Sequence, residues 1–273
     1  MTEYAARGDQ RRSMALLWGC AEVHTRGPKP GLTVPSIVGA AIDLADAEGI
    51  VSLSMRKVAE RLGKSAMALY TYVPSKAELL DLMLDTVLGE LPTAYPLEDG
   101  WRPAVEASAR DGLALYRRHP WVLQVSGARP LLGPHELDTY EAQLHLFDGL
   151  GLSGVDMARA VGVVAGFVRG ASQGVTDALA AEKATGLSDD DWWTARSPLL
   201  DEMVDKATWA TRYPTLTRIS EEQAFDQTDR PAGDDTPYTV REALDTFEFG
   251  LQRVLDGVEL FIASRSGSGS GSG

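Results

Sequence analysis

The chain has 273 residues, a formal net charge of −13 and 44% hydrophobic residues, which suits a folded protein of one large or two smaller domains. Its single cysteine excludes a disulfide framework and a cysteine-based zinc site, and it fits a reducing cytoplasm. The sequence shows neither a secretory signal nor an apolar run of roughly 20 residues. We therefore expect a cytoplasmic protein that makes no contact with a membrane.

Residues 1–32 are predicted to contain a weak helix, over residues 6–23, and then a basic arm. The arm, HTRGPKPGL, holds two prolines and two glycines and cannot be helical. Its cations, Arg26 and Lys29, suit insertion along a DNA minor groove, where concentrated negative potential attracts arginine. A plain linker with solvated charges explains the same residues equally well, so the sequence leaves both interpretations open.

Residues 54–76, SMRKVAERLGKSAMALYTYVPSK, have the pattern of a helix-turn-helix. Ser54 is suited to cap a first helix, and Gly63 ends that helix because glycine tolerates a left-handed backbone. Ser65 is suited to cap a second helix, in which Leu69 points inward. Two short helices joined by a glycine-containing turn are the arrangement that places the second helix in the major groove of DNA.

A third helix is predicted after Pro74, where Ser75 and Glu78 have the spacing of a capping box. Residues 51–76 carry five basic side chains and one acidic side chain, whereas residues 92–273 carry 16 basic and 28 acidic ones. DNA phosphates repel an acidic body, so the short positive segment is the plausible contact surface.

The run from Ile37 to Leu91 resembles the DNA-binding head of tetracycline-repressor-type regulators. The resemblance rests on three motifs in order: AAIDLADAEG, SMRKVAERLG and SAMALYTYVPSKAELL. It implies an all-α fold, with an N-terminal three-helix helix-turn-helix head over residues 33–91 and a larger helical ligand-binding and dimerisation body over residues 92–265. It also implies a homodimer that binds a double-stranded DNA operator and responds to a small-molecule effector.

The resemblance places base contacts on the exposed face of the second helix and phosphate contacts around it. The expected DNA-binding residues are Arg26, Lys29, Ser54, Arg56, Lys64, Ser65, Ala66, Met67, Ala68, Tyr70, Thr71, Tyr72 and Lys76. The second helix lacks arginine, asparagine and glutamine, the side chains that make bidentate hydrogen bonds to bases. Specificity should therefore depend on apolar contact with thymine methyl groups, on DNA shape and on the basic arm.

The body is predicted to be almost entirely helical, because its apolar residues recur at helical rather than alternating spacing. The expected helices are Trp101–His119, Trp121–Ser126, Pro134–Leu150, Val155–Lys183, Asp189–Thr208 and Val240–Ser264. The acidic, turn-rich stretch over residues 219–238 is predicted to be a mobile loop. Residues 266–273, SGSGSGSG, are expected to be a Gly/Ser tail.

Two of these helices carry patterns typical of close helix packing. Glycines recur every fourth residue in one, although each costs a helix roughly 1 kcal/mol relative to alanine. Apolar residues three and four positions apart form a coiled-coil-like seam in the last helix. The expected dimer-interface residues are Gly162, Gly166, Gly170, Gly174, Phe247, Leu251, Val254, Val258 and Phe261. The alternative is packing within one chain only.

An effector pocket among the central body helices is implied by the resemblance. The residues expected to line it are Tyr116, His119, Trp121, Gln143, His145, Phe147, Phe167, Arg169, Gln173 and Trp209. Each is also common in an ordinary core. A mixed aromatic and polar lining would suit a mid-sized amphipathic molecule.

Motifs for other chemistry are weak. Residues 149–154, GLGLSG, match the dinucleotide fingerprint, but an expected helix precedes them instead of a strand. The four histidines form no metal-binding pair, and no nucleophile motif is present, so we expect no metal, no cofactor and no enzymatic activity. The leading interpretation is a ligand-responsive transcriptional repressor. The alternatives are an architectural DNA-binding protein without a ligand and, less well supported, a helical enzyme.

Overall fold

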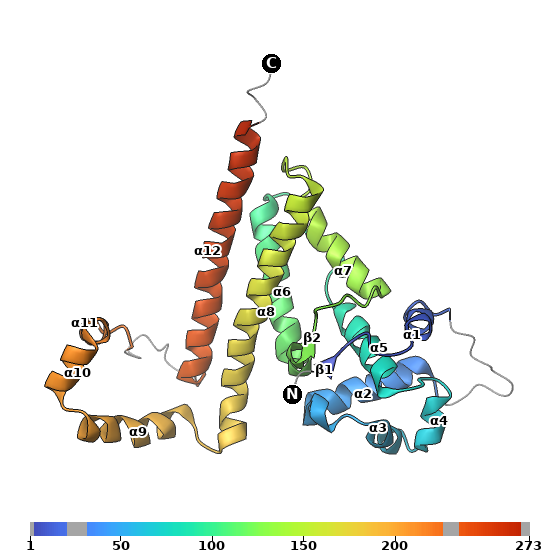
Figure 1. Ribbon diagram of the computed structural model, residues 1–273, viewed down its shortest axis with the longest axis horizontal. Coiled ribbons are helices and arrows are strands. Elements are labelled where there is room, and N and C mark those ends of the chain that lie inside the picture. Colours follow the sequence, from blue (N-terminus) through green and yellow to red (C-terminus); the bar gives the residue numbers. More distant parts are fainter. Residues whose placement is uncertain (1–2, 21–31, 226–234, 269–273) are drawn as a thin grey trace. The chain divides into compact units, whose positions relative to one another are not determined.

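The computed structural model describes residues 3–20, 32–225 and 235–268. Within these residues the chain forms twelve α-helices, two 3-10 helices and two strands of two residues each (Figure 1), which confirms the expected all-α fold. The chain divides into two compact units. Unit 1 comprises Met1–Gln173 and Phe249–Gly273, and unit 2 comprises Gly174–Glu248. This boundary cuts through two long helices.

The N-terminal segment is held in place but is less helical than expected. It contains β1 (Glu3–Tyr4) and α1 (Gln10–Leu17), and so the predicted helix over residues 6–23 is too long at both ends. Asp9 starts α1 by accepting a hydrogen bond from a backbone N–H of the first turn. Gly19 follows the helix with a φ of 65°, a left-handed conformation that glycine adopts without strain.

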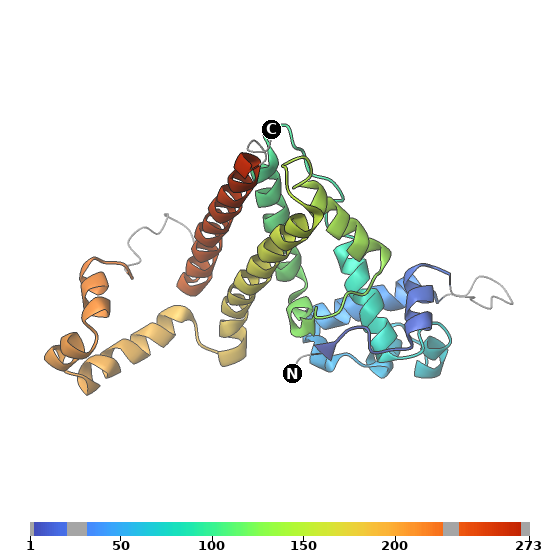
Figure 2. The same ribbon diagram turned by 45° about the horizontal axis from the view of Figure 1, so that its top comes forward.

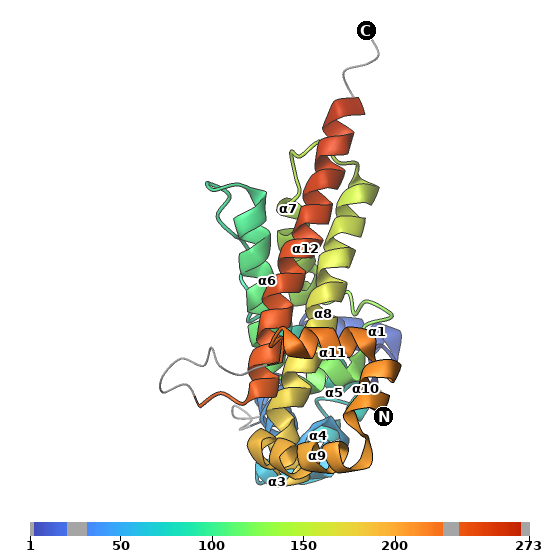
Figure 3. The same ribbon diagram turned by 90° about the vertical axis from the view of Figure 1, so that its left-hand side faces the viewer.

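The head of unit 1 is a compact group of short helices. Its elements are α2 (Val34–Glu48), η1 (Ile50–Ser52), α3 (Met55–Arg61), α4 (Ala66–Tyr70) and α5 (Lys76–Leu88). Each contributes at least one side chain to a common core, and the most deeply buried of these include Ile37, Ile50, Val58, Leu69 and Met83. Figure 3 shows these helices at the end of unit 1 away from the C-terminal end of α12. Burial of this apolar surface is what orients α4.

The rest of unit 1 consists of α6 (Trp101–Arg118), η2 (Pro120–Gln124), β2 (Val125–Ser126), α7 (Pro134–His145) and parts of α8 (Gly154–Thr185) and α12 (Tyr238–Ser268). α8 lies against α6 and α12 (Figure 2). A Cβ atom added to Gly112 on α6 would lie 3.1 Å from Val168, and one added to Gly250 on α12 would lie 2.6 Å from Phe167. Glycine at these two positions therefore permits close helix contact.

Two helix predictions in unit 1 are wrong. The segment over residues 121–126 is a 3-10 helix followed by β2, which pairs in parallel with β1. The helix predicted to run to Leu150 ends at His145, because residues 146–150 form a turn that reaches Gly149 with a φ of 73°. The parallel strand pair joins segments far apart in the sequence, and no local pattern indicated it.

Unit 2 contains α9 (Asp189–Met203), α10 (Lys206–Arg212) and α11 (Pro214–Glu221). The helix predicted over residues 189–208 is broken, because Val204 is extended and Asp205 caps α10 by accepting from the backbone of Thr208. The predicted loop over residues 219–238 is shorter than expected, since α11 continues to Glu221; residues 226–234 lie outside the described residues.

The last helix is longer than predicted. α12 extends to Ser268 and so includes the first residues of the expected Gly/Ser tail. None of the helices in the described part of the chain is long and apolar enough to cross a membrane.

Candidate nucleic-acid interface and internal cavity

The helix-turn-helix forms as the sequence predicts. Ser54 accepts a hydrogen bond from the backbone N–H of Lys57 at 3.3 Å and caps α3. Gly63 in the turn has a φ of 64°, and Ser65 caps α4. The side chain of Leu69 is fully buried and packs α4 against the core of the head. One face of α4 therefore packs inward, and the opposite face remains open.

The open face of α4 is apolar. Met67 is 75% exposed and Tyr70 is 42% exposed, and both extend from the helix into solvent. Lys64, Ser65 and Thr71 are exposed beside them. Ala66, Ala68 and Tyr72 are half-buried at the edges of this face. Met67 and Tyr70, three positions apart on this short helix, therefore form one exposed apolar patch.

Cations surround this face, and most of them have carboxylate partners. Arg56 lies 3.6 Å from Glu60 and is 80% exposed, so this pair contributes little to stability. Lys64 has no ion-pair partner among the described residues. Arg26 and Lys29 of the predicted arm lie outside the described residues.

Lys76 has a partner that the sequence did not indicate. Its ammonium lies 3.0 Å from the carboxylate of Glu3 in β1, so a phosphate contact by Lys76 has to compete with this pair. The capping box predicted at the start of α5 is also incomplete. Ser75 accepts from the backbone of Ala77, and its hydroxyl donates to the Glu78 carboxylate.

Buried carboxylates on α5 hold the N-terminal segment against the head. The Asp81 side chain accepts from the backbone of Ala6 at 2.8 Å and from the hydroxyl of Ser13 at 2.9 Å. Burial raises the pKa of Asp81 above its ordinary value. Glu78 accepts from the backbone of Asp9 at 3.1 Å. The sequence feature that could have indicated buried carboxylates here is the presence of three acids on one face of an otherwise apolar helix, at positions 78, 81 and 85.

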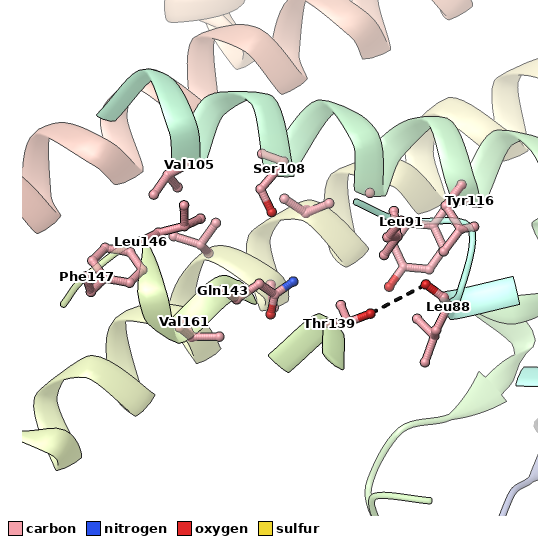
Figure 4. Close-up of a pocket in the computed structure, with 16 residues that line it drawn as sticks. Leu88, Leu91, Val105, Ser108, Tyr116, Thr139, Gln143, Leu146, Phe147 and Val161 are labelled. Carbon is pink, nitrogen blue, oxygen red and sulfur yellow. Dashed lines mark hydrogen bonds between the residues drawn. The ribbon is translucent and has the colours of Figure 1, made fainter. Parts of the chain in front are cut away.

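A cavity of about 100 Å³ lies within unit 1, between the end of α5 and helices α6, α7 and α8. Its walls are Leu88, Leu91, Val105, Ser108, Ala109, Gly112, Leu115, Tyr116, Thr139, Gln143, Leu146, Phe147, Val161, Val164, Ala165 and Val168. Figure 4 shows Phe147, Leu146 and Val105 at one end and Tyr116, Leu91 and Leu88 at the other. The Thr139 hydroxyl is already engaged, because it donates to the carbonyl of Leu88 at 3.5 Å.

The chemistry of this cavity is mainly apolar. Among the described residues that line it, none is charged, and the polar groups come from Ser108, Tyr116, Thr139 and Gln143. The structure thus brings together Tyr116, Gln143 and Phe147 of the residues predicted for a pocket. Such a lining suits a neutral molecule with a few hydrogen-bonding groups.

The other predicted pocket residues do not line this cavity: His119, Trp121, His145, Phe167, Arg169, Gln173 and Trp209. His119 and Trp121 both hydrogen-bond to Asp46 of the head. His145 is exposed at the end of α7. Trp209 belongs to α10 in unit 2.

Phe167 and Arg169 also face other parts of unit 1. Phe167 fills the space beside Gly250 on α12. The guanidinium of Arg169 donates to the carbonyls of Leu123 and Val125 at 2.8 and 2.7 Å. These hydrogen bonds hold the end of η2 and the start of β2 against α8. Gln173 is the last residue of the first part of unit 1. Apolar or aromatic character alone could not separate these packing roles from a ligand-binding role.

The predicted dimer residues divide into two groups. The glycines of α8 are exposed, and a Cβ atom added to any of the four would meet nothing within 4 Å. In contrast, Phe247, Leu251 and Val258 are 0%, 0% and 7% exposed, because the seam of α12 packs within the chain. These three are corrected to core residues. Val254 and Phe261 are half-buried in a groove that also includes Val163 of α8.

Comparisons with known proteins assign the family. Residues 37–83 match the family described as bacterial regulatory proteins, tetR family, and residues 93–262 match the tetracyclin repressor-like C-terminal domain. The HTH-type transcriptional repressor DrrR1 of Streptomyces coeruleorubidus is 43% identical over 269 residues, covering 97% of this chain and 92% of that protein. The class A tetracycline repressor of Escherichia coli is 33% identical over 141 residues, covering 50% of this chain and 63% of the repressor.

Solved structures agree with the sequence matches. ActR of Streptomyces coelicolor in complex with actinorhodin is 25% identical and superimposes with a TM-score of 0.64 over 83% of this chain and 95% of ActR. Apo ActR has a TM-score of 0.62 over 88% of this chain and all of that chain. The two family matches and the 43% identity to a curated repressor show that this chain belongs to the tetR family of bacterial regulatory proteins and is a DNA-binding transcriptional regulator.

Proposed function

We propose that the protein is a homodimeric repressor that binds a double-stranded DNA operator through α4 and releases it when an uncharged effector occupies the cavity of unit 1. The observation that carries this proposal is the uncharged cavity itself, since the same helices that wall it also contact the head. The relative DrrR1 is described as a repressor, and ActR has been solved with actinorhodin.

The size of the cavity supports release upon effector binding. Pockets that hold drug-sized ligands occupy about 300 to 1,000 Å³, whereas this cavity measures about 100 Å³. A drug-sized effector therefore fits only if α6, α7 and α8 move apart. Binding then favours a different arrangement of these helices, and the operator affinity changes by the same coupling free energy.

Base contacts in this proposal come from Lys64, Ala66, Met67, Ala68 and Tyr70. Their exposed, mostly apolar surface suits thymine methyl groups. Phosphate contacts come from Ser54, Arg56, Ser65, Thr71, Tyr72 and Lys76. The predicted arm residues Arg26 and Lys29 are proposed to add minor-groove contacts.

The dimer is proposed to form through the exposed glycine stripe of α8. Its backbone is open to close approach by a second copy, and the side chain of Val163, next to Gly162 in the sequence, is apolar and 56% exposed. A dimer places two heads on one DNA face, which allows two half-sites to be read together.

The test uses one cavity-filling variant and one matched control. Ala109 is buried in the cavity wall, so Ala109→Leu fills the space that the effector needs. Ala180→Leu makes the same change at an exposed position of α8 in unit 2. Operator binding is measured by fluorescence anisotropy with fragments of the protein's own promoter region, and effectors are found by thermal-shift screening.

We expect Ala109→Leu to keep operator affinity within about threefold and to lose its effector response, while Ala180→Leu keeps both. A wild-type protein that binds no promoter fragment would contradict the proposed function. An unchanged effector response in Ala109→Leu would show that the cavity is not the effector site.

A further inference from the structure

His119 occupies a buried position at the junction of the head and α6. It follows the last residue of α6 and is 6% exposed. Its Nδ1 atom lies 2.8 and 3.0 Å from the two carboxylate oxygens of Asp46 on α2. Its Nε2 atom lies 3.1 Å from Oε1 of Glu90, two residues beyond the end of α5. Carboxylates only accept, and a neutral imidazole has a single N–H. Both contacts are hydrogen bonds only when the ring is protonated.

The groups around the ring complete a closed network. The indole N–H of Trp121, on η2, donates to the same Asp46 carboxylate at 2.8 Å. The guanidinium of Arg118, the last residue of α6, donates to Glu90 at 2.8 Å. The charged or titratable groups at the ring are thus Asp46 from α2, Glu90 after α5 and Arg118 from α6. With a protonated ring, two cations balance two anions.

This network joins the two functional regions of unit 1. Leu115 and Tyr116, which line the cavity, lie one turn before His119 on α6. Leu88 and Leu91, on either side of Glu90, line it as well. On the other side, Asp46 belongs to α2, which packs directly against α3 of the helix-turn-helix. A displacement of α6 by an occupant of the cavity therefore acts on the contact between His119 and Asp46.

We propose that His119 is a positioning residue whose protonated ring holds α2 in its operator-binding placement, so that operator affinity falls when the ring loses its proton. The inference rests on the proposed function and adds the residues that join its two sites. The described arrangement has a cavity of about 100 Å³, too small for a drug-sized effector. Such an effector therefore disfavours the described arrangement. Under the proposed function, the arrangement that the effector disfavours is the one that binds the operator.

Two substitutions separate the two ring contacts. His119→Asn places an amide N–H close to the position of Nδ1 and keeps the contact with Asp46. His119→Gln places its amide close to the position of Nε2 and keeps the contact with Glu90 only. His145→Gln is the matched control, because it removes an exposed histidine outside the network. Circular dichroism melts establish that each variant is folded.

We expect wild-type operator affinity to decrease as the pH rises and the ring loses one of its two N–H donors. His119→Gln should bind about tenfold more weakly at the acidic end, the size expected for loss of a charge-assisted hydrogen bond. His119→Asn, which keeps only a neutral contact with Asp46, should bind at every pH about as tightly as the wild type does at the alkaline end. Neither variant should show the wild-type pH dependence, whereas His145→Gln should show it in full.

A second measurement needs no DNA. A proton–nitrogen spectrum of the imidazole groups in the full-length wild-type protein should show both ring nitrogens of His119 protonated at about pH 6, with the signals assigned by their absence in His119→Asn. A singly protonated ring, or a pH dependence that persists in both variants, would overturn the inference. A wild-type protein that binds no fragment of its promoter region would count against the proposed function instead, and the spectrum separates the two failures.

Discussion

Lys76 illustrates how a single contact changes the role expected of a residue. The sequence and the family resemblance make it a phosphate contact, while the structure pairs its ammonium with Glu3 of β1 at 3.0 Å. Both side chains are about one third exposed, at 35% and 33%, so this pair is partly screened by water and can open at small cost. The N-terminal segment and DNA therefore compete for the same cation.

For Lys76→Ala we expect weaker binding to all DNA sequences and a salt dependence flattened by about 0.9 unit, because one phosphate contact is lost. Glu3→Gln should have the opposite effect and strengthen binding modestly, since it frees the ammonium. Affinities measured at several salt concentrations decide this. An unchanged slope in Lys76→Ala would remove Lys76 from the phosphate contacts.

Asp81 provides a prediction about stability and pH. Burial raises its pKa above the ordinary 3.8, so the folded state binds its proton more tightly than the unfolded state does. Protonation then favours folding, and this contribution is complete below the ordinary pKa and is lost as the pH rises through the raised pKa.

The stability of wild type relative to Asp81→Asn should therefore increase as the pH falls from about 7 towards 4. Thermal melts of both proteins across this range measure the difference. A difference that is constant with pH would show that Asp81 ionises alike in the folded and unfolded chains.

At the scale of elements, α4 depends on the rest of the head for its position. It has five residues, too few to be stable as an isolated helix, and only Leu69 among them is buried. The glycine turn and the serine cap determine where it begins. The core of α2, α3 and α5 determines which way it faces.

Leu69→Ala should lower the free energy of unfolding by about 2 to 5 kcal/mol, the usual cost of emptying a buried leucine site. Because the head depends on this contact, operator affinity should fall even at temperatures where the body remains folded. Met67→Ala, at a side chain that is 75% exposed, is the control: we expect unchanged stability and weaker operator binding. Chemical denaturation together with anisotropy distinguishes the two effects.

At the scale of the whole molecule, the exposed glycine stripe of α8 is the surface best suited to a second copy. Within one chain these glycines meet no side chain, and each destabilises the helix by roughly 1 kcal/mol relative to alanine. The seam of α12, which looked equally suited, is mostly used within the chain, since Leu251 and Leu255 are fully buried.

Gly166→Leu should therefore convert the protein from a dimer to a monomer, because the added side chain keeps two backbones apart. Ala180→Leu, on the same helix but off the stripe, should remain a dimer. Sedimentation equilibrium at micromolar concentration measures the mass. A dimeric Gly166→Leu would exclude the stripe from the interface, and a monomeric wild type would exclude the dimer.

The sequence by itself determined the features that depend on neighbouring residues: Ser54 and Ser65 as caps, Gly63 as the turn, and the helical character of the body. These follow from hydrogen bonds and backbone preferences within a few positions. Only the tertiary structure decided the partners of Lys76, Asp81 and His119, the break at Val204 and the inward face of α12. The partners of these three side chains lie 29 to 75 residues away in the chain. Such contacts depend on how the whole core closes, and local spacing does not identify the partner.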